Sequence, residues 1–157
     1  MAAPTPTARV TPAGKLLPDG YQSLTTFSLD TNIDIWEVEM TPIGLDLGEP
    51  INITSQHNTA WRTMFLRQLI TATPQTIRGF YDPELYSQIL AMRGINQTIT
   101  QDYYDGSTIC YYGGVTRVEF GPLVEGTVPE VTITITPTNR DSTGAEYGPV
   151  VTSVTGT

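Results

Sequence analysis

A single short helix signal stands in a chain that otherwise favours strands, and this contrast restricts the fold more than any other feature. Asp82 is suited to cap the first backbone N–H groups of a helix, and Pro83 fits the first helical position because it has no N–H to lose. An apolar stripe follows on one helical face: Leu85, Ile89 and Met92. Gly94 is suited to the left-handed conformation that ends helices. We expect a helix over about residues 82–93, which needs a sheet to pack on because it has only about three turns.

The segments around this helix predict β-structure. Thr98 to Val118 predicts a hairpin that turns at Asp105-Gly106. Val131 to Thr136 alternates apolar residues with threonine and is the most regular strand of the chain. Ile33 to Met40 predicts a strand with a bulge near Ile35, because its alternation is imperfect. We therefore predict a mainly β fold, a β-sandwich or small barrel with one flanking helix.

Length and composition predict one domain with two extensions. A chain of 157 residues fits a single domain, and its charged content of 15% lies below the roughly 25% of typical soluble domains. Residues 1–20 are rich in Pro, Ala, Thr and Gly and predict an N-terminal arm that cannot pack alone. We assign residues 21–140 to the β-domain and residues 141–157 to a C-terminal extension.

Two segments and one glycine pair leave more than one interpretation open. Thr41 to Pro50 contains two prolines and two glycines and predicts an irregular connection, whose apolar residues either fold back on the domain or contact another subunit. Trp61 to Ile70 fits a helix or a strand equally well. The pair Gly113-Gly114 indicates a bulge or a close approach of two backbones.

No group of residues points to catalysis, a metal site or a cofactor. His57 and Cys110 are each the single residue of their kind, which excludes an intramolecular disulfide and a cysteine-based zinc site. There is no Gly-x-Ser-x-Gly turn and no glycine loop of the phosphate-binding kind. Glu37 and Glu39 are expected to share a strand face, which we interpret as a solvated acidic surface. We expect a protein that is not an enzyme.

The charge balance disfavours a nucleic-acid-binding function. Sixteen acidic residues and eight basic ones give a formal net charge of −8. Affinity for nucleic acid comes mainly from Lys and Arg, which displace counterions from phosphates. Such a surface suits a protein that must not adhere to DNA, and it equally suits any soluble acidic protein.

Targeting signals are missing from the sequence as it stands. The segment from Met1 to Pro6 lacks the basic start and apolar core of a signal peptide. No apolar run approaches the roughly 20 residues that span a bilayer. We expect a protein made in a cytoplasm, with no membrane partner.

Several fragments, in this order, resemble the major tail tube proteins of long-tailed bacteriophages of the siphovirus type. They are Met40 to Ile51, His57-Asn58-Thr59, Phe80 to Pro83, Asp105 to Thr108, Val124-Glu125-Gly126 and Val131 to Asn139. Each fragment is short, and it is their order and spacing over roughly residues 33–140 that carries the resemblance.

The resemblance implies a structural subunit of the phage tail, located in the virion after assembly in the host cytoplasm. Members of the family form hexameric rings that stack into a tube, and one sheet of each subunit lines the lumen through which DNA passes. The implied partners are further copies of the chain, the tape measure, the terminator and the distal tail protein. For an acidic lumen lining we name Asp34, Glu37 and Glu39. For contacts between subunits we name Ile43, Leu45, Leu47, Val150 and Val151.

Two other functions remain open. A tail-terminator or head–tail connector protein has a related fold but forms one ring and stops. A carbohydrate-binding β-sandwich would use the tyrosines that flank the predicted hairpin: Tyr103, Tyr104, Tyr111 and Tyr112. In antiparallel pairs, such tyrosines more often pack across strands or in an interface.

Overall fold

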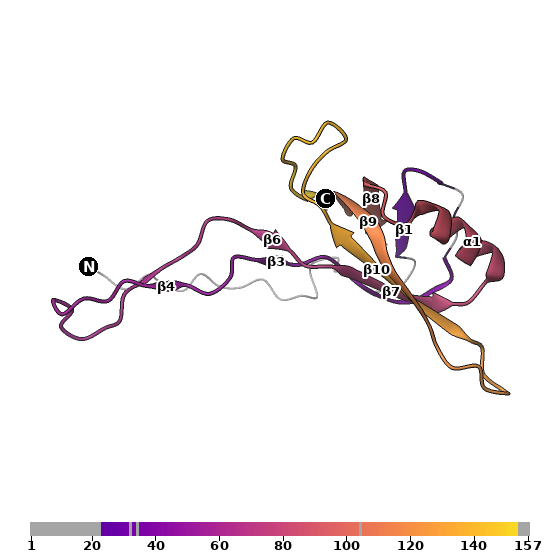
Figure 1. The fold of residues 1–157 in the computed structure, drawn as a ribbon, viewed down its shortest axis with the longest axis horizontal. Coiled ribbons are helices and arrows are strands. Elements are labelled where there is room, and N and C mark those ends of the chain that lie inside the picture. The colour runs from indigo at the N-terminus through magenta and orange to yellow at the C-terminus, as the bar shows by residue number, and fades with distance from the viewer. Residues whose placement is uncertain (1–22, 32, 34, 104, 154–157) are drawn as a thin grey trace.

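One antiparallel sheet forms the body of the protein. The computed structural model describes residues 23–31, 33, 35–103 and 105–153. The strands of the main sheet are β1 (Leu24–Phe27), β2 (Glu37–Thr41), β7 (Gln75–Phe80), β8 (Gln97–Asp102), β9 (Thr108–Phe120), β10 (Glu130–Pro137) and β11 (Val150–Thr152). Their order is β1-β8-β9-β10-β7-β2, with β11 beside the first residues of β9 (Figure 1). The predicted mainly β fold is confirmed.

The sheet curls until its two outer strands, β1 and β2, are joined by side chains. The backbone N–H of Thr25 donates to Glu37 Oε1 at 3.0 Å, and the Thr25 hydroxyl lies 3.1 Å from Met40 Sδ. The concave side holds the core. Alternate residues of the strands make most of it: Phe27, Ile77, Ile99, Tyr111, Val115, Val131, Ile133 and Ile135. Ile33 and Ile35 also belong to the core, but they precede β2, because the strand predicted from Ile33 begins only at Glu37. Full burial of each aliphatic side chain contributes roughly 1.5–3 kcal/mol relative to exposure.

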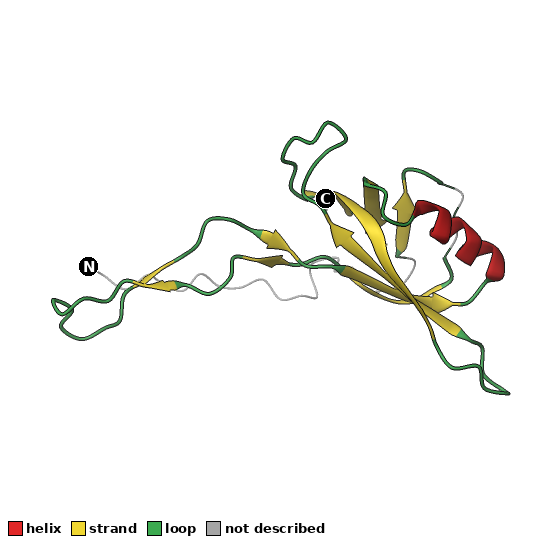
Figure 2. Cartoon of the chain, in the orientation of Figure 1, coloured by secondary structure: helices red, strands yellow, loops and turns green. Residues whose placement is uncertain are grey.

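The predicted helix is present as α1 (Pro83–Met92) and covers the core on the concave side (Figure 2). Asp82 Oδ1 accepts a hydrogen bond from the backbone N–H of Glu84 at 3.0 Å. The stripe of Leu85, Ile89 and Met92 is buried in the core, as predicted. Gly94 has a φ of 71° and its N–H donates to Val115 O, which ties the helix end to β9.

The hairpin of β8 and β9 forms as predicted, and its glycine pair marks a close approach. Asp105 Oδ1 accepts from the Ser107 N–H at 2.9 Å, and Gly106 has a φ of 83°. At Gly114, a Cβ atom would lie 2.9 Å from the backbone oxygen of Ile95. Of the two interpretations offered for the pair, the close backbone approach is therefore correct.

The expected shared face of Glu37 and Glu39 is wrong. The β-bulge lies between these two residues, slightly later than predicted, and pairs Glu37 with Gly79 but Glu39 with Arg78. Because neighbouring residues of β7 point to opposite sides of the sheet, the two glutamates do so too. Glu37 turns to the concave side and is half-buried, whereas Glu39 lies on the convex side.

Residues 42–74 form a long two-stranded extension of β2 and β7, which we call the arm (Figure 1). Its short pairs are β3 (Leu45–Asp46) with β6 (Thr71–Ala72), and β4 (Ile51–Asn52) with β5 (Met64–Phe65). The first segment of the arm is thus not fully irregular as expected, because Leu45–Asp46 finds a partner strand across the arm. The open question of residues 61–70 is also answered, since the segment is extended and contains β5.

Candidate assembly surfaces

The described residues hold no grouped chemistry of the kind a catalytic or metal site needs. No cluster of three or more His, Cys, Asp or Glu side chains occurs among them. His57 lies in an exposed turn at the arm tip, and half-buried Cys110 lies in β9. Within the same residues, no helix has the length and apolar character to cross a membrane. The surfaces of the molecule therefore hold the features of interest.

The arm exposes apolar side chains that no part of the described chain covers. Every residue from 45 to 71 is exposed, and Trp61 and Leu69 reach 85% and 86% exposure. The other large apolar side chains of this stretch are Leu45, Leu47, Ile51, Ile53, Met64, Phe65, Leu66 and Ile70. An isolated two-stranded hairpin is marginally stable in water, and exposed apolar surface of this extent marks an interaction site.

Side-chain hydrogen bonds give the arm tip a defined turn. Asn58 donates through Nδ2 to Trp61 O at 3.0 Å and to Thr63 Oγ1 at 2.7 Å, and its own N–H donates to Ser55 O. Thr63 N–H donates to Thr54 Oγ1 at 2.9 Å. These bonds hold the tip together without a hydrophobic core.

The convex face of the main sheet is polar and its arginines are paired. Arg78 lies between two carboxylates, with Nη2 3.0 Å from Glu39 and Nε 3.6 Å from Glu130. Arg117 pairs with Glu119, and both residues lie on β9, on the other side of β10 from Arg78. The remaining outward positions of β7 and β10 are mostly threonines: Thr76, Thr132, Thr134 and Thr136. Arg78 and Arg117, the arginines that the described part of the chain places on this face, thus each have a carboxylate beside them.

The concave side carries a short chain of buried polar groups instead of a ligand site. Tyr111 donates to Gln75 Oε1, and Gln75 Nε2 donates to Thr25 Oγ1 at 3.2 Å. Burial raises the pKa of the Tyr111 hydroxyl above its usual value. Tyr112 packs edge-to-face on Tyr147 at a centroid distance of 5.1 Å. Tyr111 and Tyr112 are therefore used in packing, whereas Tyr103 is half-buried beside the turn and Tyr104 lies outside the described residues.

The residues named for subunit contacts lie on different parts of the surface. Ile43 packs against the core, whereas Leu45 and Leu47 are exposed on the arm. Val150 and Val151 are exposed in β11, where they pair with Cys110 and Ile109 of β9. Asp34 lies outside the described residues. Their roles in assembly stay predictions.

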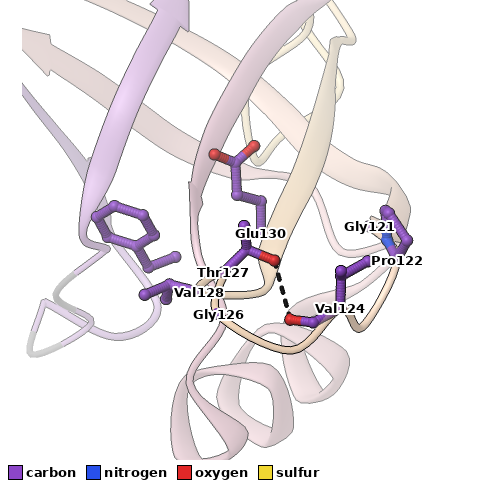
Figure 3. A pocket seen from close by; sticks show the side chains of 8 residues that line it. Gly121, Pro122, Val124, Gly126, Thr127, Val128 and Glu130 are labelled. Atoms are coloured by element: carbon purple, nitrogen blue, oxygen red, sulfur yellow. Dashed lines mark hydrogen bonds between the residues drawn. The ribbon is translucent and has the colours of Figure 1, made fainter.

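A groove lies at the end of the body formed by the turn between β9 and β10 (Figure 3). It is open to solvent and has a volume of about 610 Å³. Its lining includes Phe80, Pro122, Val124, Thr127, Val128 and Glu130. Thr127 Oγ1 donates to Val124 O at 2.9 Å and so fixes the turn that forms one wall. In Figure 1 this turn lies at the lower right, away from the arm, whose tip lies at the far left.

Solved structures match the fold, although no family model and no curated protein matches the sequence. A chain from the virion of a native gene transfer agent particle superposes with a TM-score of 0.60 at 14% identity, covering 87% of this chain and 100% of that one. The fold of this chain is thus shared with a protein of a gene transfer agent virion. A chain from the six-fold symmetrised baseplate of the anti-feeding prophage has a TM-score of 0.60 at 13% identity, with coverages of 85% and 92%. A protein of a type six secretion system superposes less closely, with a TM-score of 0.45 at 13% identity and coverages of 80% and 90%.

The sequence alone predicts contacts at Leu45 and Leu47 but not that residues 42–54 and 61–74 form one hairpin. The signal was present in the alternation of Ile51 and Ile53 on one side and of Thr63 and Phe65 on the other. Such alternation on both sides of a polar turn is typical of a hairpin.

Proposed function

We propose that this chain is the subunit of a phage-type tail tube, assembling as hexameric rings that stack into a hollow conduit for DNA. The observation that carries the proposal is the arm, a long apolar projection on a body whose fold is found in two phage-like particles. A chain that exposes so much apolar surface on a defined hairpin needs further protein to cover it. The six-fold symmetrised baseplate of the anti-feeding prophage is consistent with a six-membered ring here.

The convex face of the main sheet suits the lining of such a conduit. In the described strands of this face, the threonines are uncharged and both guanidinium groups are paired with carboxylates, so they have little attraction for a passing phosphate backbone. Glu39 keeps the acidic role that the sequence suggested, whereas Glu37 turns toward the core and Asp34 lies outside the described residues. Tape measure, terminator and distal tail proteins complete the set of proposed partners.

Electron microscopy of the purified full chain tests the proposal. We expect rings or tubes about 100 Å wide, from the size of a domain of this length arranged in a ring. A single ring that never stacks would favour the terminator or connector function instead. A protein that stays monomeric at high concentration contradicts both.

A variant without the arm tests the role of the arm in assembly. In this variant, a short Asn-Gly turn replaces residues 43–73 and joins β2 and β7 directly. We expect the body to stay folded, because only Ile43, Gly44 and Ala72 of this segment are even partly buried, and of these only Ile43 packs against the core. Tubes formed by this variant as readily as by the full chain would contradict the role given to the arm.

A further inference from the structure

Charges are unevenly distributed between the distal part of the arm, residues 50–72, and the β9–β10 turn, whereas residues 42–49 of the arm carry Asp46 and Glu49. Arg62 and Arg67 are two of the eight basic residues of the chain, and none of its sixteen acidic residues lies between positions 50 and 72. Conversely, no Lys or Arg lies between positions 118 and 139, where the chain has Glu119, Glu125 and Glu130. Two surfaces of opposite sign thus occur on one molecule.

The carboxylate of Glu125 is the one in this turn that is free to pair with a new cation. Glu119 lies against Arg117, and Glu130 lies 3.6 Å from Arg78. Among the described residues, Glu125 has no ion pair, and neither do Arg62 and Arg67 of the arm. Arg67 lies across the hairpin from Gly48, in the stretch that carries Asp46 and Glu49, whereas Arg62 lies nearer the tip of the arm.

The same two surfaces are also apolar. In the turn, Leu123 is 83% exposed and stands beside Val124 and Val128, which line the groove. On the arm, the side chains that flank the arginines are Trp61, Leu66 and Leu69, which are all strongly exposed. The arm therefore presents an apolar strip with two arginines, and the β9–β10 turn presents an apolar groove with Glu125 next to its lining residues in the chain.

The two surfaces lie at opposite ends of the molecule and cannot meet within one copy as it stands (Figure 1). Two different patches of one chain that fit each other make a head-to-tail contact, which repeats from copy to copy. Opposite charges on the two patches set the orientation of such a contact and disfavour arm-to-arm or groove-to-groove pairing.

We propose that the distal arm, residues 61–69, docks into the β9–β10 groove of a second copy of this chain. Arg62 or Arg67 pairs there with Glu125, and the apolar side chains of the arm cover Phe80, Val124 and Val128. This inference rests on the proposed tube function and adds to it the surface that receives the arm.

A charge swap tests the docking in the full chain. Glu125→Arg places like charges in the contact, and we expect the protein concentration needed for tube formation to rise about tenfold or more. Arg62→Glu combined with Arg67→Glu should raise it similarly. Uniting these two substitutions with Glu125→Arg should restore assembly to within a few-fold of the unmodified protein. The matched control is Glu146→Arg, the same change on an exposed residue of another loop, which should assemble normally.

A second readout follows Trp61 itself. The chain has two tryptophans, so Trp36→Phe leaves Trp61 as the only reporter. Its fluorescence should move to shorter wavelength on assembly, because the groove removes the indole from water. Glu125→Arg should delay that shift to higher protein concentration.

The outcomes separate the two proposals. If the unmodified protein forms tubes while Glu125→Arg behaves like Glu146→Arg, the groove is the wrong receptor and the tube function stands. If Trp61 becomes buried on assembly but Glu125→Arg does not change the concentration needed for tube formation, the arm docks on another surface of the neighbour. If the unmodified protein forms neither rings nor tubes, the tube function fails and the docking fails with it.

Discussion

The Tyr111 hydroxyl donates a hydrogen bond to the side-chain oxygen of Gln75 inside the curled sheet, and so links β9 to β7 although β10 lies between them. Both residues are almost fully buried, at 1% and 0% exposure. Gln75 in turn donates a hydrogen bond from Nε2 to Thr25 Oγ1 of β1. This bond helps to hold the sheet curled, because it connects strands from opposite sides of the core.

Removing the Tyr111 hydroxyl is expected to destabilise the body. Tyr111→Phe leaves the Gln75 oxygen buried without its donor, at a cost of about 1–3 kcal/mol in the free energy of unfolding. Urea unfolding at neutral pH measures it. Tyr112→Phe is the matched control, since its half-buried ring packs on Tyr147. Equal stability of Tyr111→Phe and the unmodified protein would show that the bond contributes nothing.

The same residue predicts sensitivity to alkali. Burial raises the pKa of Tyr111 in the folded protein above the value of about 10 of an unfolded chain. The folded state therefore keeps the proton more tightly, and the stabilisation is complete below pH 10 and is lost as the pH rises further. Stability measured from pH 8 upward should fall near and above pH 10, and Tyr111→Phe should reduce the slope.

Acid should loosen the turn between β8 and β9. Hydrogen bonds from the Ser107 hydroxyl and N–H lower the pKa of Asp105. A lowered pKa in the folded state stabilises the turn above the unfolded pKa of about 4, and this is lost as the pH falls through the lower, folded value. The protection factor of the Ser107 amide in hydrogen exchange should drop there. Asp105→Asn should remove the pH dependence, and a dependence that persists would point to another group.

Gly79 is expected to tolerate no side chain. A Cβ atom at this position would lie 2.7 Å from the backbone oxygen of Trp36, which precedes β2 and lies beside β7. We expect Gly79→Ala to cost about 1–3 kcal/mol through displaced backbone. Gly148→Ala has open space around it and should be close to neutral. A neutral Gly79→Ala would mean that β2 is free to shift.

Substitution by alanine should change the stability of the monomer strongly at one leucine and hardly at all at another. Leu85 of α1 is 4% exposed, so Leu85→Ala should cost about 2–5 kcal/mol in the free energy of unfolding. Leu69 of the arm is exposed, so Leu69→Ala should change the stability of the monomer by no more than about 0.5 kcal/mol. Thermal unfolding below the assembly concentration compares them. A large loss from Leu69→Ala would show that the arm packs within its own chain.

Truncation tests the two extensions. Deleting residues 1–18 or 141–157 should leave a folded domain that stacks poorly, because the described core lies between these segments. The second deletion also removes β11 and its short ladder on β9, so we expect a small loss of stability there. Circular dichroism and microscopy follow folding and stacking separately. Unfolding of the core by either deletion would contradict the assignment.

Local signals in the sequence were sufficient for the elements whose residues are close together along the chain. The cap at Asp82, the stripe through Ile89 and the turn at Gly106 act within a few residues, and all three are present as predicted. The alternation of Val131 to Thr136 likewise separates the buried and polar faces of β10. Each of these patterns sets the backbone geometry of the few residues that form it, so the sequence predicts it without knowledge of the segments that pack against it.

The sequence by itself thus determined a mainly β domain with one capped helix, and an acidic chain without a cluster of catalytic residues. Only the tertiary structure decided which face each glutamate of β2 takes, because a bulge is set by the pairing of two strands. It also decided that residues 42–74 leave the body as one arm, since their hydrogen bonds run across the turn between distant residues. Apolar residues that look like core in the sequence are left in water there because no layer of the fold reaches them.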